Sequence, residues 1–261
     1  MPATDFEARE ASAAAAGAAV KRAYVRRMFS DIASRYDLLN RVLSLGIDRC
    51  WRRVALGRLG WELAPGGTYL DLCAGTLDVA AALSARRGFA GRVIGADFAE
   101  PMLRAGRSKL AGRPISPVVA DALSLPVADG MLAGAIVAFG IRNVADLDAA
   151  LREVHRALRP GARFVILEFS TPRLAVVRAI YHAYFHRVLP RIGALVSGHG
   201  TAYTYLPDSV KRFPEMEVLA ERMRVAGYAD VSWRALTFGI AAVHVGTKTV
   251  DGGRWTVDGR S

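Results

Sequence analysis

The sequence predicts an α/β fold in which a mostly parallel β-sheet carries helices on both faces. From residue 68 to residue 170, apolar strand-like segments alternate with amphipathic helical segments, an order typical of parallel sheets covered on both sides. Beyond residue 170 this alternation stops, and a helical segment followed by two strand-like segments ends the pattern. A chain of 261 residues is long enough for one such domain with additions.

The patterning also predicts the order of the elements. Residues 1–20, rich in alanine, and residues 251–261 are predicted to be tails outside a single domain at 21–250. Within that domain, residues 21–62 are predicted to form helices that cap the site. Parallel strands are expected near residues 68–73, 92–97, 115–120, 132–138 and 162–169. Helices are expected near residues 78–87, 99–110 and 145–158, the last of them ended by Pro160-Gly161.

The remaining elements close the sheet. Residues 171–207 form a long insertion between the alternating region and the end of the domain. A helix is then expected near 214–227, with Gly227 at its end. Two strands follow, at 230–236 and 239–247.

The turn after the first strand predicts a nucleotide-like ligand. Leu70-Asp-Leu-Cys-Ala-Gly-Thr76 leads from an apolar strand into a turn of small residues, and Asp97 ends the next strand. Such a turn lets a ligand approach the backbone, and an acid about twenty residues further on can bind ribose hydroxyls. Only Gly75 is a glycine, so the G-x-G-x-x-G pattern of dinucleotide sites is missing. The looser pattern suits S-adenosylmethionine (SAM), and the two closing strands fit the seven-stranded methyltransferase sheet, whose last strand is antiparallel.

Each residue at this edge also has a structural explanation. A buried strand–turn–helix corner without a ligand is the alternative for the turn, and a cap for the following helix is the alternative for Asp97. Asp121 and Ala122 follow the third strand, where a carboxylate suits the adenine amino group but is also common in turns. Thr76 is suited either to capping backbone amides or to contacting the methionine moiety.

The end of the fourth strand carries candidates for catalysis. In Ala138-Phe-Gly-Ile-Arg-Asn-Val144, Arg142 and Asn143 could donate hydrogen bonds to a phenolate or orient a water molecule. Alternatively, Arg142 pairs with a nearby acid and Asn143 caps the next helix. Tyr36 and Asp37 belong to a polar and aromatic cluster in the early helices, which either closes a substrate pocket or consists of helix caps.

Composition limits the possible partners. The formal charge of +11 favours an anionic partner, either nucleic acid or an anionic membrane, although a basic solvated surface explains it equally well. The two cysteines predict neither a disulfide framework nor a metal site, and they fit a reducing cytoplasm. No apolar segment is long enough to span a bilayer.

Residues 173–195 form a basic amphipathic segment, which suits either a membrane surface or a packed lid. His182 and His186 have metal-ligand spacing but lack further ligands, so no metal is expected.

Several blocks together resemble the ubiquinone/menaquinone biosynthesis C-methyltransferase family, from about residue 28 to residue 248. They appear in the family's order and comprise Phe29-Ser-Asp-Ile-Ala-Ser-Arg-Tyr-Asp-Leu-Leu-Asn40, Leu70–Thr76, Phe139–Val144, Ala150–Gly161, Leu167–Ser170, Tyr203–Ser209 and Leu236–Gly246. Ala138 stands where many members have serine, Leu77 where glycine is usual, and Asp48 where histidine is usual.

The resemblance implies a class I SAM-dependent methyltransferase that methylates a ring carbon of a polyprenylated quinol. It implies SAM contacts from Thr76, Asp97, Asp121 and Ala122, beside Gly75 and Ala138. Arg142 and Asn143 are then expected to stabilise the phenolate, with Tyr36 and Asp37 as weaker catalytic candidates. It also implies an enzyme in the cytoplasm, held peripherally at the inner face of the membrane, alone, as a homo-oligomer or in a quinone-synthesis complex.

Two other functions remain compatible with the sequence. A SAM-dependent RNA methyltransferase would explain the positive charge, but the chain carries no recognisable RNA-binding appendage, and nucleic acid is not expected as a partner. A non-catalytic SAM-binding component of a quinone-synthesis complex would accommodate the altered turn at Leu77. Whether the substrate is the menaquinone precursor, the ubiquinone precursor or both stays open.

Overall fold

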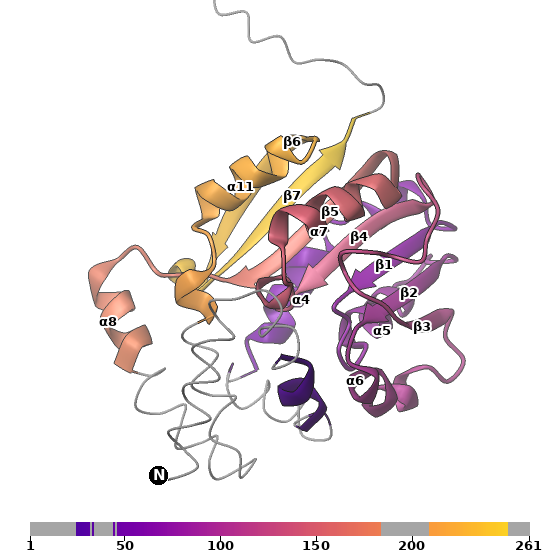
Figure 1. Ribbon diagram of the computed structural model, residues 1–261, viewed down its shortest axis with the longest axis horizontal. Coiled ribbons are helices and arrows are strands. Elements are labelled where there is room, and N and C mark those ends of the chain that lie inside the picture. The colour runs from indigo at the N-terminus through magenta and orange to yellow at the C-terminus, as the bar shows by residue number, and fades with distance from the viewer. Residues whose placement is uncertain (1–24, 32, 34–43, 45, 184–208, 250–261) are drawn as a thin grey trace, which may run out of the picture.

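Seven strands form one sheet in the computed structural model, which describes residues 25–31, 33, 44, 46–183 and 209–249 (Figure 1). The strand order is β3-β2-β1-β4-β5-β7-β6, with β7 antiparallel to both of its neighbours and the other pairings parallel. This is the predicted mostly parallel sheet with an antiparallel last strand. The strands are β1 (Thr68–Leu72), β2 (Arg92–Asp97), β3 (Ile115–Val119), β4 (Leu132–Ala138), β5 (Leu158–Phe169), β6 (Tyr228–Leu236) and β7 (Ala241–Lys248).

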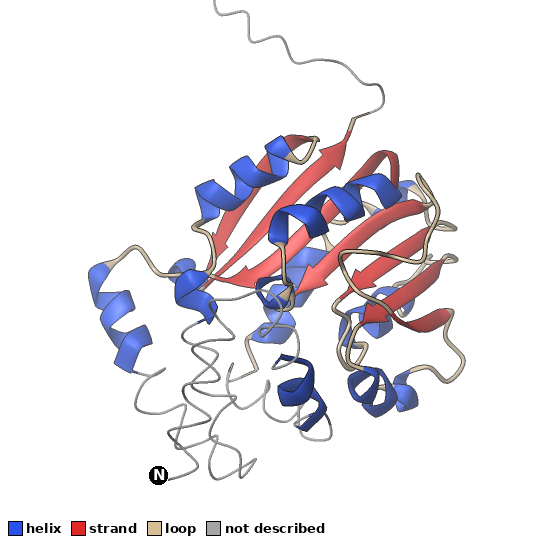
Figure 2. Cartoon of the chain, viewed as in Figure 1, coloured by secondary structure: helices blue, strands red, loops and turns tan. Residues whose placement is uncertain are grey.

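Helices cover both faces of the sheet (Figure 2). One face packs against α4 (Asp48–Leu56), α5 (Asp78–Ser84) and α6 (Glu100–Ala105). The other packs against α7 (Leu147–Ala157) and α11 (Met216–Val225). Alternate residues of β1 belong to the two cores: Tyr69 lies on the first face and Leu70 on the second, as strand geometry requires. Short 3₁₀ turns, η2 (Trp61–Leu63), η3 (Arg107–Lys109), η4 (Ile141–Asn143) and η6 (Thr237–Gly239), join these elements.

Helix and strand limits differ from the sequence prediction at several ends: the helix expected at 99–110 is divided into α6 and η3, and the junction of α7 and β5 lies earlier than expected. The helix α7 ends at Ala157, because Leu158 is already extended, and β5 begins there rather than at residue 162. Pro160 and Gly161 therefore lie inside an irregular part of β5, where the four residues 159–162 lie opposite the single residue Ala133 of β4. A residue that precedes proline disfavours the helical region, so the chain leaves the helix before Pro160.

The insertion after β5 is described only in part. The helix α8 (Ala175–Ala183) begins it, and residues 184–208 lie outside the described part, as do the predicted tails at 1–20 and 251–261. Of the predicted early helices, residues 25–31 and α4 are described. None of the helices in the described ranges is long and apolar enough to cross a membrane.

Candidate active site

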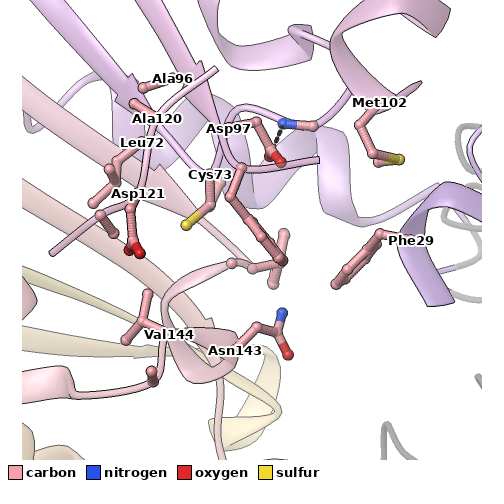
Figure 3. Close-up of a pocket in the computed structure, with 17 residues that line it drawn as sticks. Phe29, Leu72, Cys73, Ala96, Asp97, Met102, Ala120, Asp121, Asn143 and Val144 are labelled. Atoms are coloured by element: carbon pink, nitrogen blue, oxygen red, sulfur yellow. Dashed lines mark hydrogen bonds between the residues drawn. The ribbon is translucent and has the colours of Figure 1, made fainter. Parts of the chain in front are cut away.

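A cavity opens at the carboxyl edge of the sheet, beside the ends of β1, β2, β3 and β4 (Figure 3). It contains about 710 Å³ of empty space, part of which is open solvent. Because β1 lies between β2 and β4, the strand order reverses here, which is where open α/β sheets bind ligands. Six of the residues predicted from sequence line the cavity: Gly75, Asp97, Asp121, Ala122, Ala138 and Asn143.

Asp97 braces the turn that follows β1. Its Oδ2 accepts a hydrogen bond from the Gly75 N–H at 2.8 Å, and its Oδ1 accepts one from the Ala99 N–H at 2.8 Å. Burial raises the pKa of Asp97, and the backbone N–H groups that it accepts from oppose this shift. A carboxylate has about four acceptor positions, so these two bonds are compatible with a further contact to ribose, which stays a prediction.

Leu77 points into the protein core and does not line the cavity. Its side chain is fully buried on the face that packs against α5, and a Cβ placed on Gly95 of β2 would lie 2.4 Å from its Cδ2. The residue has φ of 65°, the left-handed conformation that usually favours glycine. The bulk of Leu77 therefore fills space above Gly95, and its backbone is strained, but its side chain leaves the ligand space open.

Sequence reasoning missed the apolar wall of the cavity. Phe29, from the helical residues 25–31, faces the cavity together with Met102 (Figure 3), and Phe98 also lines it. Phe29 also packs against Ala99 and Met102, so residues 25–31 cover the cavity beside the end of β2. The only signal in the sequence was the position of Phe29 at the start of a block shared with the family.

The junction between β1 and β4 holds two strained residues at the cavity. Cys73 has φ of 52° and Phe139 has φ of 63°, although neither is glycine. A Cβ on Gly140 would lie 2.3 Å from the Cβ of Cys73, so only glycine fits at this close approach. Left-handed residues of this kind persist where the surrounding structure fixes them, and they gather at functional sites.

Arg142 forms a buried ion pair and does not line the cavity. Its Nη1 donates to Glu168 Oε1 at 2.7 Å and to the Phe139 carbonyl at 2.5 Å, and the two charged side chains are 8% and 2% exposed. The guanidinium also lies over the ring of Phe169, 5.5 Å from its centroid. The pairing with a nearby acid, considered as an alternative in the sequence, is thus observed, and it holds the turn that carries Asn143.

The other predicted residues differ in their position relative to the cavity. Asn143 lines the cavity, and α7 is capped by Asp146, whose Oδ1 accepts from the Ala149 N–H at 2.9 Å, so Asn143 is not the cap of that helix. Thr76 is buried beside Gly106 and is not part of the cavity lining. Tyr36 and Asp37 lie outside the described residues.

The loop that carries Asp121 and Ala122 is clamped by the helix α7. Glu153 Oε1 accepts from the Leu125 N–H at 2.7 Å, and Arg156 Nη1 donates to the Val127 carbonyl at 3.0 Å. Arg156 also binds Glu153 at 2.8 Å and pairs with Asp129 at the far end of the loop. The position of Asp121 at the cavity therefore depends on contacts made outside the cavity.

We expect Arg156→Ala to weaken SAM binding several-fold, because truncation frees the loop between β3 and β4. Loss of charge-assisted hydrogen bonds at about 1.5–3 kcal/mol each would also lower the melting temperature. Isothermal titration with S-adenosylhomocysteine and thermal melting measure the two effects. Arg152→Ala, an exposed change on the same helix, is the matched control. Equal affinities for both variants would contradict a role of the clamp in ligand binding.

The lining residues suit SAM. Carboxylates at the ends of two neighbouring strands can accept from ribose hydroxyls and the adenine amino group, and the apolar side chains Phe98, Met102 and Val144 can pack against an adenine ring. Among the described residues, no group of three or more His, Cys, Asp or Glu side chains could hold a metal ion. Sheet order, antiparallel β7 and this cavity together define a class I SAM-dependent methyltransferase.

Comparisons with known proteins agree with this class. The chain matches the ubiE/COQ5 methyltransferase family model over residues 18–248, and it belongs to that family. It is 49% identical to "Demethylmenaquinone methyltransferase" of Thermus thermophilus, over 85% of this chain and 100% of the relative. It is 46% identical to "Ubiquinone/menaquinone biosynthesis C-methyltransferase UbiE" of Geobacter sulfurreducens, over 86% of this chain and 88% of the relative.

Solved structures share the fold at low sequence identity. A SAM-dependent methyltransferase of Thermotoga maritima, described as a possible histamine N-methyltransferase, superposes with a TM-score of 0.57 at 19% identity, covering 85% of this chain and all of that one. A chain of the complex between the Trm112 methyltransferase activator of Haloferax volcanii and a putative methyltransferase also superposes on this fold. Its TM-score is 0.62 at 18% identity, covering 85% of this chain and 97% of that chain. SAM is the methyl donor of this enzyme because the chain belongs to the ubiE/COQ5 methyltransferase family.

Proposed function

We propose that this enzyme transfers the methyl group of SAM to a ring carbon of a polyprenylated quinol, of the demethylmenaquinol type or its ubiquinone counterpart. The observation that carries the proposal is the relative from Thermus thermophilus, matched over its entire length at 49% identity and named for this reaction. The cavity supports it, because it combines carboxylates suited to adenosine with an aromatic wall suited to a flat ring.

Six residues are proposed to hold SAM. Asp97 binds the ribose hydroxyls, Asp121 accepts from the adenine amino group, and Ala122 packs beside the ring. Gly75 and Ala138 leave room for the methionine moiety, since neither carries a side chain larger than methyl. Thr76 contributes through the backbone of the turn rather than through a side chain at the cavity. SAM supplies an electrophilic methyl group on a positively charged sulfur.

The chain's own residues prepare the quinol. Removal of a proton from the ring hydroxyl places electron density on the neighbouring carbon, which is the nucleophile. Asn143, at the cavity, is proposed to donate to the developing phenolate, and such donors typically contribute about 3–4 kcal/mol. Arg142 is proposed to act through the turn that it holds, because Glu168 and the Phe139 carbonyl take its Nη1 hydrogen bonds. Tyr36 and Asp37 stay candidates for accepting the proton.

Methyl transfer with purified protein tests the function. Incubation with methyl-labelled SAM and either demethylmenaquinol or the ubiquinone precursor should yield a product heavier by one methyl group, detected by mass spectrometry. Activity on one quinol alone would define the substrate. Label in RNA, or SAM binding without transfer to any quinol, would overturn the proposal in favour of the two alternatives raised by the sequence.

A polyprenylated substrate is membrane-borne, so we also propose peripheral contact of this enzyme with an anionic membrane.

A further inference from the structure

Three large apolar side chains are exposed on segments that follow the ends of β5 and β6, at the edge of the sheet that carries the cavity. Phe238 of η6 is 74% exposed, and Leu174 and Val176, at the start of α8, are 60% and 73% exposed. We call these three residues the apolar tip. Figure 1 shows α8 projecting from the body of the fold at the side where β5 ends. The close approach of Gly239 to Pro172 brings η6 beside the segment that leads into α8, and exposed apolar side chains that gather on one part of a surface mark interaction sites more often than isolated ones do.

The backbone of η6 is strained in a way that presents Phe238 to solvent. Thr237, Phe238 and Gly239 have φ of 46°, 56° and 90°, so three consecutive residues adopt the left-handed conformation. The conformation costs about 1–2 kcal/mol for a residue other than glycine. Phe238 is exposed, so burial of its ring does not offset this backbone strain. We take an exposed aromatic side chain on a strained turn to indicate a function at the surface.

Hydrogen bonds fix η6 to the end of β5 and to the wall of the active site. Ser170 Oγ donates to the Gly239 carbonyl at 2.7 Å, and a Cβ on Gly239 would lie 3.4 Å from the Cα of Pro172. Trp51 Nε1 donates to Thr237 Oγ1 at 2.8 Å. The Trp51 ring in turn packs against Phe139, which lines the cavity, with centroids 6.0 Å apart. The part of the apolar tip that carries Phe238 is therefore held in a fixed position near the cavity.

Exposed positive charges lie on α8 and on the neighbouring segment that precedes α11. Arg178 of α8 and Lys211 and Arg212 of the helical residues before α11 are exposed. Arg173 pairs with Glu217, so its charge is largely offset, and Glu215 is the other exposed acid in this region. The two segments lie close together, because Tyr181 of α8 and Ser209 both lie beside Arg142. Exposed apolar side chains flanked by basic ones are the composition of a surface that binds anionic lipid.

We propose that the apolar tip enters the surface of a bilayer containing anionic phospholipid, with Phe238 as the main anchor and Arg178, Lys211 and Arg212 contacting headgroups. The inference rests on the proposed function in one respect, since it gives a polyprenylated quinol a short path from the bilayer to the cavity. The occupant is a lipid surface because the overall charge of +11 complements it and because the substrate class resides there.

Binding to vesicles tests the apolar tip directly. Sedimentation is measured with phosphatidylcholine vesicles that contain or lack phosphatidylglycerol, at low and high salt. Phe238→Asp and Leu174→Asp should each weaken binding by about tenfold or more, as expected when one large apolar side chain no longer leaves water. Lys211→Gln with Arg212→Gln should remove the preference for phosphatidylglycerol. Leu63→Asp, an 80% exposed leucine in η2 before β1, is the matched control and should bind as the unmodified chain does.

Activity separates this inference from the proposed function. Phe238→Asp should retain turnover of a quinol without an isoprenoid tail and lose turnover of a vesicle-borne quinol. Undiminished vesicle binding by Phe238→Asp and Leu174→Asp, or binding that ignores phosphatidylglycerol, would overturn the inference. Absence of methylation of any quinol would overturn the proposed function and leave the vesicle result valid. Thermal unfolding checks whether Phe238→Asp lowers the melting temperature. If it does, Leu174→Asp is the variant that tests vesicle binding.

Discussion

Replacing Arg142 by alanine is expected to lower the free energy of unfolding by about 3–5 kcal/mol, because it leaves Glu168 buried without its charge partner. Glu168 is 2% exposed, and besides the guanidinium it accepts from the Phe169 N–H at 2.9 Å. The change also removes the donor to the Phe139 carbonyl, so the turn carrying Asn143 should lose its fixed position. Urea denaturation and turnover at saturating SAM measure the two effects.

A double variant distinguishes stability from catalysis at this pair. In Arg142→Met with Glu168→Gln, no charge is buried, and the amide oxygen of glutamine can still accept from the Phe169 N–H. Most of the stability should return, since well-packed neutral replacements of buried ion pairs are often close to neutral. Turnover should stay at least about tenfold low, with the SAM affinity unchanged, if Arg142 positions Asn143. Recovery of turnover together with stability would contradict that role.

The general fold was predictable because it depends on periodic patterns. The alternation of strands and helices gave the parallel sheet, and the segments after Gly227 gave the antiparallel end. At the junction of α7 and β5 the prediction placed the strand late, because Pro160-Gly161 was taken as a helix end although the chain had already extended at Leu158. A proline–glycine pair shows that a helix cannot continue through it, but it does not show at which earlier residue the helix ended.

Predictability of the site depended on the kind of contact. Asp97, Asp121 and Asn143 were found because strand ends meet at one edge, which sequence order alone predicts. Phe29 was missed because its place in the cavity follows from tertiary packing of the early helix on Met102. The partner of Arg142 was also hidden, since Glu168 is 26 residues away and looks from sequence like any polar residue in a strand end. For Phe29 and for the Arg142–Glu168 pair, the sequence does not show in which direction the side chains point.

Leu77 and Gly95 are expected to be strongly coupled in stability. Gly95→Ala should cost about 1–3 kcal/mol by overpacking, because its methyl group would lie 2.4 Å from Leu77 Cδ2 in a fully buried site. Leu77→Ala should cost about 2–5 kcal/mol by leaving a cavity. The double variant should be more stable than the sum of these costs predicts, by roughly 0.5–3 kcal/mol, because the new methyl group occupies space that the leucine left.

The same residue decides whether the unusual turn affects SAM. If Leu77 fills the core, Leu77→Ala should leave the dissociation constant of S-adenosylhomocysteine within about twofold, a change too small to reflect a lost contact. Leu77→Gly is the matched comparison: it makes the same cavity but relieves a left-handed φ of 65°, so it should be more stable than Leu77→Ala by about 1 kcal/mol. A clear gain in ligand affinity on shortening Leu77 would instead place its side chain against the methionine moiety and contradict the packing against Gly95.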